Sequence, residues 1–336
     1  MNKRNVTIDN ARGISILSMV GLHSHLSDGF YYPLTHELFV RFLMLFLVPF
    51  FFFISGTFYN EKELKVVFKD KISSIIKPVF FTVLLYNMIF WDGKWYNLYS
   101  DAYGIFQFPL YALWFMPTLF VTILLGSIVA KSEQNNFIWM SLLLVLIALT
   151  SYKDILQVLF DDSKFLINSR LPFTAESLIF TIPLFLLGYY LKDYVLNFKI
   201  KITCLLLYIV VIIFSIFKLN VIINIGIFVF HPYMICLITS LFAIYILLCV
   251  SQMCKKYPRL SWLLGICGKN SLYIALFHGP LLFHIDKALN KLDINLMPMF
   301  IKDLTVFSLS VFVSLLFKSL LGKNTLTKWM FAIREK

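Results

Sequence analysis

Charged side chains are scarce in this chain. Asp, Glu, Lys and Arg make up 14% of its 336 residues, whereas hydrophobic residues make up 60% and the mean hydropathy is +0.81. A soluble domain is closer to a quarter charged and half apolar. The composition therefore excludes an ordinary soluble domain and indicates a protein that crosses a membrane several times.

The chain also lacks the motifs of soluble enzymes. It has no G-x-S-x-G nucleophile elbow and no Walker or dinucleotide-binding glycine pattern. Its histidines do not show the i, i+4 spacing of a helical zinc site, so we expect no metal. The number of cysteines is odd, and no two of them form a C-x-x-C pair. We therefore expect reduced thiols that pack inside the protein and no disulfide framework. They are Cys204, Cys236, Cys249, Cys254 and Cys267.

Long apolar runs are what the sequence does contain. A membrane-spanning helix needs about 20 mostly apolar residues. Ten runs qualify as candidate spans: 10–27, 38–58, 73–91, 108–130, 136–151, 174–191, 201–219, 233–252, 268–286 and 299–320. A further run at 221–230 is too short to cross and is expected to be re-entrant or interfacial. We predict an all-α, polytopic integral membrane protein of about ten transmembrane helices, built as a single membrane-embedded domain over residues 1–336 with no separate soluble domain.

Basic residues collect at the N-terminus and in every second loop. Because cytoplasmic loops retain Lys and Arg, this pattern predicts that both termini are cytoplasmic. The formal net charge of +12 is then read as a topology signal, and nucleic acid is not an expected partner. The same orientation places Arg12 at the cytoplasmic surface and His23 toward the far side.

The first apolar helix carries Arg12 and His23 on one stripe. The two residues are eleven apart, so they share nearly the same helix face at a separation of about 16 Å. A second histidine, His278, lies in the apolar run SLYIALFHGP. Ionisable groups inside a membrane are costly and indicate function, although a histidine that only hydrogen-bonds a neighbouring helix is the structural alternative. A neutral imidazole can take a proton from a hydroxyl and return it, which acyl transfer to an alcohol requires.

The second apolar run ends in PFFFFISG. Ser55 and Gly56 would let another backbone or a ligand approach closely, although a lipid-facing aromatic run is a plausible alternative. Lysines follow at once, and Lys69, Lys71 and Lys77 are predicted to form a phosphate-binding ledge for a polyanionic cofactor. The simpler interpretation is that these lysines only mark a short cytoplasmic loop.

Three stretches read together resemble the membrane acyltransferase-3 family, especially its fucose 4-O-acetylase-like branch. IDNARGISILSMVGLH is similar to the opening helix of the family, PFFFFISG to its second-helix signature, and GKNSLYIALFHGP to its late helix. Trp114 in ALWFMPTLF and Gly188 in LFLLGYYLKD fit the same pattern. The resemblance implies ten spans with both termini inside the cell, in the cytoplasmic (inner) membrane of a bacterium.

The resemblance implies an O-acetyltransferase. Acetyl would move from cytoplasmic acetyl-CoA to a hydroxyl of a cell-surface polysaccharide or its lipid-linked glycan precursor. His23 would be the essential histidine, and Arg12 would hold the donor or orient the site. Relatives often carry paired arginines where this chain has the ledge lysines, and lysine lacks the bidentate fork that arginine offers to phosphate. Ser55 is grouped with those lysines at the donor.

The remaining predicted site residues surround the histidine. An acid to orient His23 is expected at the outer ends of the spans, where Asp28, Glu37 and Glu176 are available. His278 and Trp114 are predicted to lie beside the acceptor or behind the reacting groups. The imidazole either deprotonates a sugar hydroxyl or accepts the acyl group itself.

A transporter or flippase of a lipid-linked saccharide is the main alternative. In that case the basic ledge would recognise a lipid phosphate, and the two intramembrane histidines would relay protons. The lack of internal repeats and the scarcity of buried carboxylates count against it. The acceptor sugar and the oligomeric state are left open by the sequence.

Overall fold

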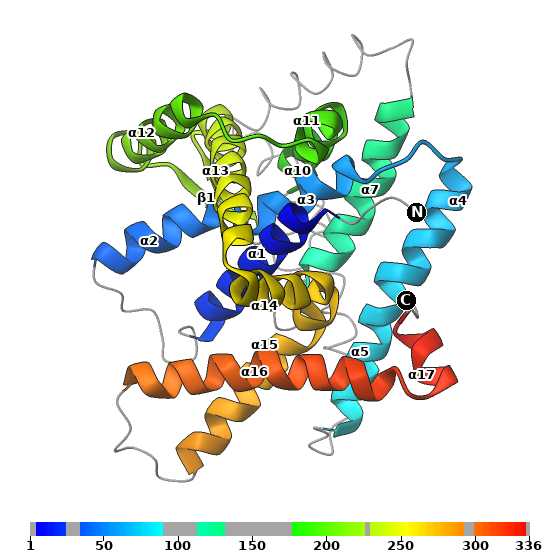
Figure 1. Cartoon of the computed structure of the whole chain (residues 1–336). Coiled ribbons are helices and arrows are strands. Elements are labelled where there is room, and N and C mark those ends of the chain that lie inside the picture. The colour runs from blue at the N-terminus through cyan, green and yellow to red at the C-terminus, as the bar shows by residue number, and fades with distance from the viewer. Residues whose placement is uncertain are drawn as a thin grey trace, which may run out of the picture.

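The computed structural model describes residues 5–24, 34–89, 113–131, 177–225, 229–291 and 299–333, and most of them are helical (Figure 1). In chain order the elements are α1 (Val6–Ser24), α2 (Leu34–Met44), α3 (Leu47–Thr57), α4 (Leu64–Lys71), the π-helical turn η2 (Ile72–Ile76), α5 (Lys77–Ile89), α7 (Phe115–Lys131), α10 (Leu178–Tyr190), α11 (Lys192–Leu196), α12 (Ile202–Lys218), β1 (Ile222–Asn224), β2 (Val229–His231), α13 (Tyr233–Met253), the 3₁₀ turn η7 (Cys254–Lys256), α14 (Pro258–Lys269), α15 (Ser271–Lys291), α16 (Met299–Leu321) and α17 (Thr325–Met330). The helical fold agrees with the predicted all-α class, whereas the ten spans and the cytoplasmic termini stay predictions.

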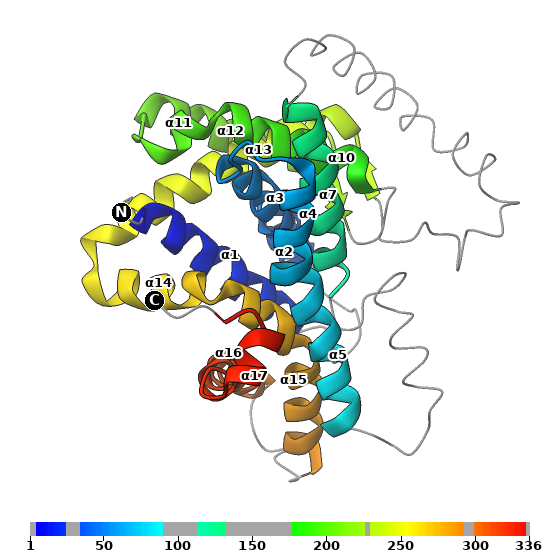
Figure 2. The same cartoon turned by 90° about the vertical axis from the view of Figure 1, so that its right-hand side faces the viewer.

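Helix α1 runs through the middle of the bundle (Figures 1 and 2). It begins at a capping residue, because the Asn5 side-chain oxygen accepts hydrogen bonds from the backbone N–H groups of Thr7 and Ile8. It then packs against α3, α13, α14, α15 and α16. Asn10 is fully buried and donates to the carbonyl of Ser251 and to the hydroxyl of Ser261, so a polar bond from α1 reaches both α13 and α14.

Two glycines bring α1 into backbone contact with α14. A Cβ atom on Gly13 would lie 2.1 Å from the Leu264 carbonyl oxygen, and one on Gly268 would lie 1.9 Å from the Asp9 carbonyl oxygen. No real side chain fits at such distances. The two helices therefore meet at their closest approach only because both positions lack a side chain.

A second glycine pair joins α3 to α10. A Cβ atom on Gly56 would lie 1.8 Å from the Phe185 carbonyl oxygen, and one on Gly188 would lie 1.8 Å from the Phe53 carbonyl oxygen. The prediction that Gly56 admits a close neighbour is confirmed, and the neighbour is a helix backbone.

Three stretches in the described segments are long and apolar enough to cross a membrane: Phe39–Thr57, Tyr233–Lys256 and Ile301–Leu321. They match the predicted spans 38–58, 233–252 and 299–320. The bent pair α14 and α15 adds a fourth if it forms one broken span. Helices α7, α10 and α12 are apolar but shorter, at 17, 13 and 17 residues. The predicted span 136–151 lies outside the described residues.

The predicted span 268–286 begins at a sharp turn of the chain. Helix α14 ends at Lys269, and α15 leaves it at a bend of 80°. Asn270 closes α14: its side chain donates to the Ile266 carbonyl, and its backbone N–H donates to the carbonyls of Ile266 and Cys267. All but the first three residues of the predicted span therefore lie in α15, and its crossing of the membrane stays a prediction.

The lysine-rich segment after the second span is helical and is not a loop. Lys69 and Lys71 lie in α4, Lys77 opens α5, and the π-helical turn η2 joins the two helices. The predicted third span, 73–91, thus continues a helix that begins at Leu64. Single π-helical turns recur at functional sites.

The short apolar run at 221–230 forms a hairpin in its described part. Strands β1 and β2 pair antiparallel, with Ile223 opposite Phe230. Val221, Ile223 and Ile225 are buried, and the Ile225 carbonyl accepts a hydrogen bond from the Ser177 hydroxyl just before α10. The hairpin is the one departure from helix among the elements the structure describes.

The glycine contact between α3 and α10 predicts the outcome of single methyl additions. Gly56→Ala and Gly188→Ala should each destabilise the protein by about 1–3 kcal/mol, because the two backbones must separate. Gly21→Ala is the matched control, since its Cβ would find its nearest neighbour, Phe307, only at 3.9 Å. Thermal unfolding in detergent tests this. Equal unfolding temperatures for all three variants would contradict the packing.

Candidate functional site

His23 and His278 meet near the end of α1. The Nδ1 atom of His23 lies 3.0 Å from the Nε2 atom of His278. The ring centroids are 5.2 Å apart, and the ring planes differ by 9°. His278 is fully buried, whereas His23 is half-buried. Two predicted site residues that are 255 positions apart in sequence therefore form one hydrogen-bonded pair.

The hydrogen bonds of His278 fix the direction of this pair. Its Nδ1 atom lies 2.9 Å from the Ile274 carbonyl oxygen and 3.0 Å from the Ala275 carbonyl oxygen. Because carbonyl oxygens only accept hydrogen bonds, Nδ1 must carry the proton. In the neutral ring Nε2 is then an acceptor, and its partner, Nδ1 of His23, must donate. A neutral His23 is left with its lone pair on Nε2.

A proline and two hydroxyl groups lie next to His278. Pro280 lies in α15 two residues after the histidine and has no N–H to donate within the helix. The Tyr86 hydroxyl of α5 donates to the Phe277 carbonyl at 3.0 Å, and the Ser310 hydroxyl of α16 donates to the His278 carbonyl at 3.2 Å. Sequence reasoning missed both hydroxyls. In the sequence, Tyr86 and Ser310 are distinguished only as polar side chains within apolar runs.

Arg12 lies on the same helix as His23 but does not join the histidine pair. Helix α1 is continuous from Val6 to Ser24, so the predicted stripe and its separation of about 16 Å are retained. The Arg12 guanidinium lies over the Phe58 ring, 5.1 Å from its centroid. This cation–π contact holds the Arg12 guanidinium next to the end of α3.

The three ledge lysines occupy different surroundings. Lys69 and Lys71 are two residues apart on α4, so their side chains leave the helix on nearly opposite sides. Lys69 is exposed and Lys71 is half-buried. Lys77 is half-buried and lies over the Trp329 ring of α17, 4.3 Å from its centroid. The ledge is therefore a helical surface rather than one cluster of ammonium groups.

Ser55 and Trp114 make contacts that do not involve the histidine pair. The Ser55 hydroxyl donates to the Phe52 carbonyl within α3. Trp114 packs edge-on against Phe115 at the start of α7. Glu37 lies in α2, in a stretch whose side chains are outside the described residues, and Glu176 and Asp28 lie outside them altogether.

The described segments bring no three His, Cys, Asp or Glu side chains close enough together to hold a metal ion. All five cysteines fall within those segments, and each is a free thiol. The groups that the pair itself offers to chemistry are its two imidazoles. A partly accessible ring with a lone pair on Nε2 and a buried hydrogen-bond partner at Nδ1 can accept a proton or an acyl group.

A family model described as an acyltransferase domain matches residues 5–321. The comparisons with curated proteins and with solved structures found no match. The matched range contains both helices of the histidine pair and well over half of the chain. The chain therefore belongs to the acyltransferase-3 family.

Proposed function

We propose that this protein is a membrane O-acetyltransferase. It moves acetyl from cytoplasmic acetyl-CoA to a hydroxyl of a cell-surface polysaccharide or of its lipid-linked precursor, as the fucose 4-O-acetylase-like branch of the family does. The observation that carries the proposal is the His23–His278 pair, in which hydrogen bonding leaves the His23 Nε2 lone pair available. Membership of an acyltransferase family supports the same reaction class.

The reaction needs one group that accepts and then returns a proton. The Nε2 atom of His23 takes the proton of the acceptor hydroxyl as its oxygen attacks the thioester carbonyl. When the tetrahedral intermediate collapses, the C–S bond breaks and the CoA thiolate takes that proton from His23. The same lone pair could instead attack the thioester and carry acetyl as acyl-histidine, and trapping with hydroxylamine distinguishes the two routes.

His278 is proposed as a positioning residue. It accepts the His23 Nδ1–H bond and so selects the tautomer with a free Nε2, as a carboxylate does in a catalytic triad. Its own orientation is set by the carbonyls of Ile274 and Ala275. His278 thus orients His23, a role for which the sequence analysis expected an acidic side chain.

The donor is proposed to enter from the side of Arg12. Its guanidinium, held on Phe58, and the exposed Lys69 are the cations on offer to the CoA phosphates. Lys71 lies two residues further along α4, and Lys77 lies at the start of α5 over the Trp329 ring. The acyl arm would then follow the Arg12 face of α1 toward His23.

Replacing His23 tests the reaction itself. His23→Ala should lower O-acetylation by about 100- to 10,000-fold, because the general base is lost. His284→Ala is the matched control, since it removes a histidine of α15 outside the pair. O-acetyl groups are measured by NMR on polysaccharide from a host that makes the candidate acceptor, with equal amounts of each variant in the membrane. Undiminished acetylation would refute the proposal, and loss of polysaccharide export in place of acetyl would favour a transporter.

Replacing His278 separates positioning from catalysis. His278→Ala should lower kcat on the order of 100-fold with little change in the KM for acetyl-CoA, because His23 loses its tautomer selection. His278→Gln should recover part of this loss, since its amide oxygen can accept the Nδ1–H bond. A purely structural role predicts equal loss in both variants together with a lower unfolding temperature.

Replacing Lys69 and Lys71 of α4 tests the donor site. Lys69→Ala with Lys71→Ala should weaken acetyl-CoA binding several-fold while the KM for the acceptor stays unchanged, because only the donor carries phosphates. The matched control is Lys199→Ala with Lys201→Ala, which removes two exposed lysines before α12. Isothermal titration with acetyl-CoA measures the effect. Equal donor affinity in both double variants would reduce the α4 lysines to topology markers.

A further inference from the structure

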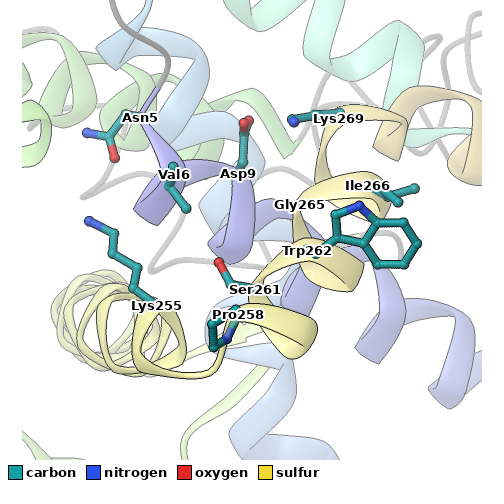
Figure 3. A pocket seen from close by; sticks show the side chains of 10 residues that line it. All are labelled: Asn5, Val6, Asp9, Lys255, Pro258, Ser261, Trp262, Gly265, Ile266 and Lys269. Carbon is teal, nitrogen blue, oxygen red and sulfur yellow. The ribbon is translucent and has the colours of Figure 1, made fainter.

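A cavity of about 760 Å³ lies between the start of α1 and helix α14, away from the histidine pair (Figure 3). Asn5, Val6 and Asp9 line it from α1 and the residue before it. Lys255, Ser261, Trp262 and Lys269 are among the lining residues from η7 and α14. The proposed reaction uses none of these side chains.

The cavity has a basic rim. Figure 3 shows the Lys255 side chain on one side, reaching toward Asn5, and the Lys269 ammonium on the other, directed toward Asp9. Asp9 is the one acid among the residues that line the cavity, and it is buried. Lys256 and Arg259 are exposed, and each follows a lining residue in sequence, Lys255 on η7 and Pro258 on α14. The charge at this rim therefore fits an anion.

The outer face of α14 is apolar and aromatic next to that rim. Trp262 is 68% exposed and Leu263 49% exposed, and the Trp262 indole lies beside Ile266 (Figure 3). An exposed indole flanked by basic residues is typical of the boundary between the lipid headgroups and the hydrocarbon. Exposing Trp262 and Leu263 together to water would be unfavourable, because both side chains are apolar.

The position of the cavity agrees with a membrane surface. Tyr233–Lys256 is one of the stretches able to cross a membrane, and it ends at Lys255 and Lys256. Helix α14 starts two residues later and meets α15 at 80°. If α13 and α15 cross the membrane, α14 lies along its surface, with the cavity at headgroup depth.

The acyl donor does not fit this cavity. Its lining on α1 ends at Asp9, fourteen residues and about 21 Å from His23 along the helix. Toward His23 the two helices close onto each other, because the Gly13 and Gly268 positions leave no room for a side chain between the backbones. An occupant here is thus a ligand of the membrane surface.

We infer that this cavity binds the headgroup of an anionic phospholipid. Lys255 and Lys269 contact the phosphate from opposite sides, and the acyl chains follow Trp262 and Leu263 into the bilayer. Each juxtamembrane lysine near anionic lipid contributes enough to change the affinity about fivefold.

The test uses the full chain, delipidated in detergent, with phosphatidylglycerol as the probe and native mass spectrometry to count bound lipid. Lys255→Gln with Lys269→Gln should lower the affinity by about fivefold for each lysine. Lys199→Gln with Lys201→Gln is the control of equal charge change, and it should bind as the unaltered chain does. Phosphatidylcholine should bind weakly to all three. Unfolding temperatures check that each variant is folded.

A second measurement locates the chains of the lipid. In nanodiscs, phosphatidylglycerol with brominated acyl chains should quench tryptophan fluorescence less in Trp262→Phe than in the unaltered chain, as bromine quenches on contact. Equal lipid affinity in the two lysine double variants would overturn the site. So would displacement of the lipid by inorganic phosphate or coenzyme A, because either result would assign the cavity to a soluble anion. These readouts do not depend on acetyl transfer.

Discussion

Helices α1 and α14 touch backbone to backbone, because Gly13 and Gly268 remove the two side chains that would hold them apart. A contact of this kind resists sliding, since almost every other residue of either helix would bring a Cβ into the same space. Each histidine of the pair follows its glycine by ten residues. From this fixed point α1 runs straight to His23, whereas the chain after Gly268 turns by 80° before α15 reaches His278. The 3.0 Å distance between the two imidazoles thus depends on the packing of α1 against α14 and on the bend that follows it.

The use of a histidine as the partner of His23 suits an apolar interior. A carboxylate buried in the bundle would need its own cation or several donors to offset its desolvation. A neutral imidazole needs one donor and one acceptor partner, and His278 finds the acceptor in two carbonyls of its own helix. The pair can then remain uncharged until a proton is transferred. The hydroxyls of Tyr86 and Ser310 donate to the backbone carbonyls of Phe277 and His278 next to the pair.

Local patterns predicted the parts of this site that a single helix determines. Arg12 and His23 share a stripe because the helical period alone places them there, and the structure retains the helix. The pairing of His23 with His278 depends on tertiary packing over 255 residues of sequence, so no local pattern contains it. The bend at Asn270 was invisible for a related reason: the apolar residues continue through it, and hydropathy does not register the side-chain and backbone bonds that end α14. The helical state of the lysine segment was missed because charge was read as a sign of a loop.

The length of α1 separates the two proposed binding events. Asp9 lines the cavity near the start of the helix, whereas His23 lies fourteen residues and about 21 Å further along it. The backbone contact of Gly13 and Gly268 lies between these two positions. A lipid bound in the cavity contacts α14 and the first turn of α1. The position of α1 is set by its contact with α14. A bound lipid can therefore change the geometry of the histidine pair only through the packing of these two helices.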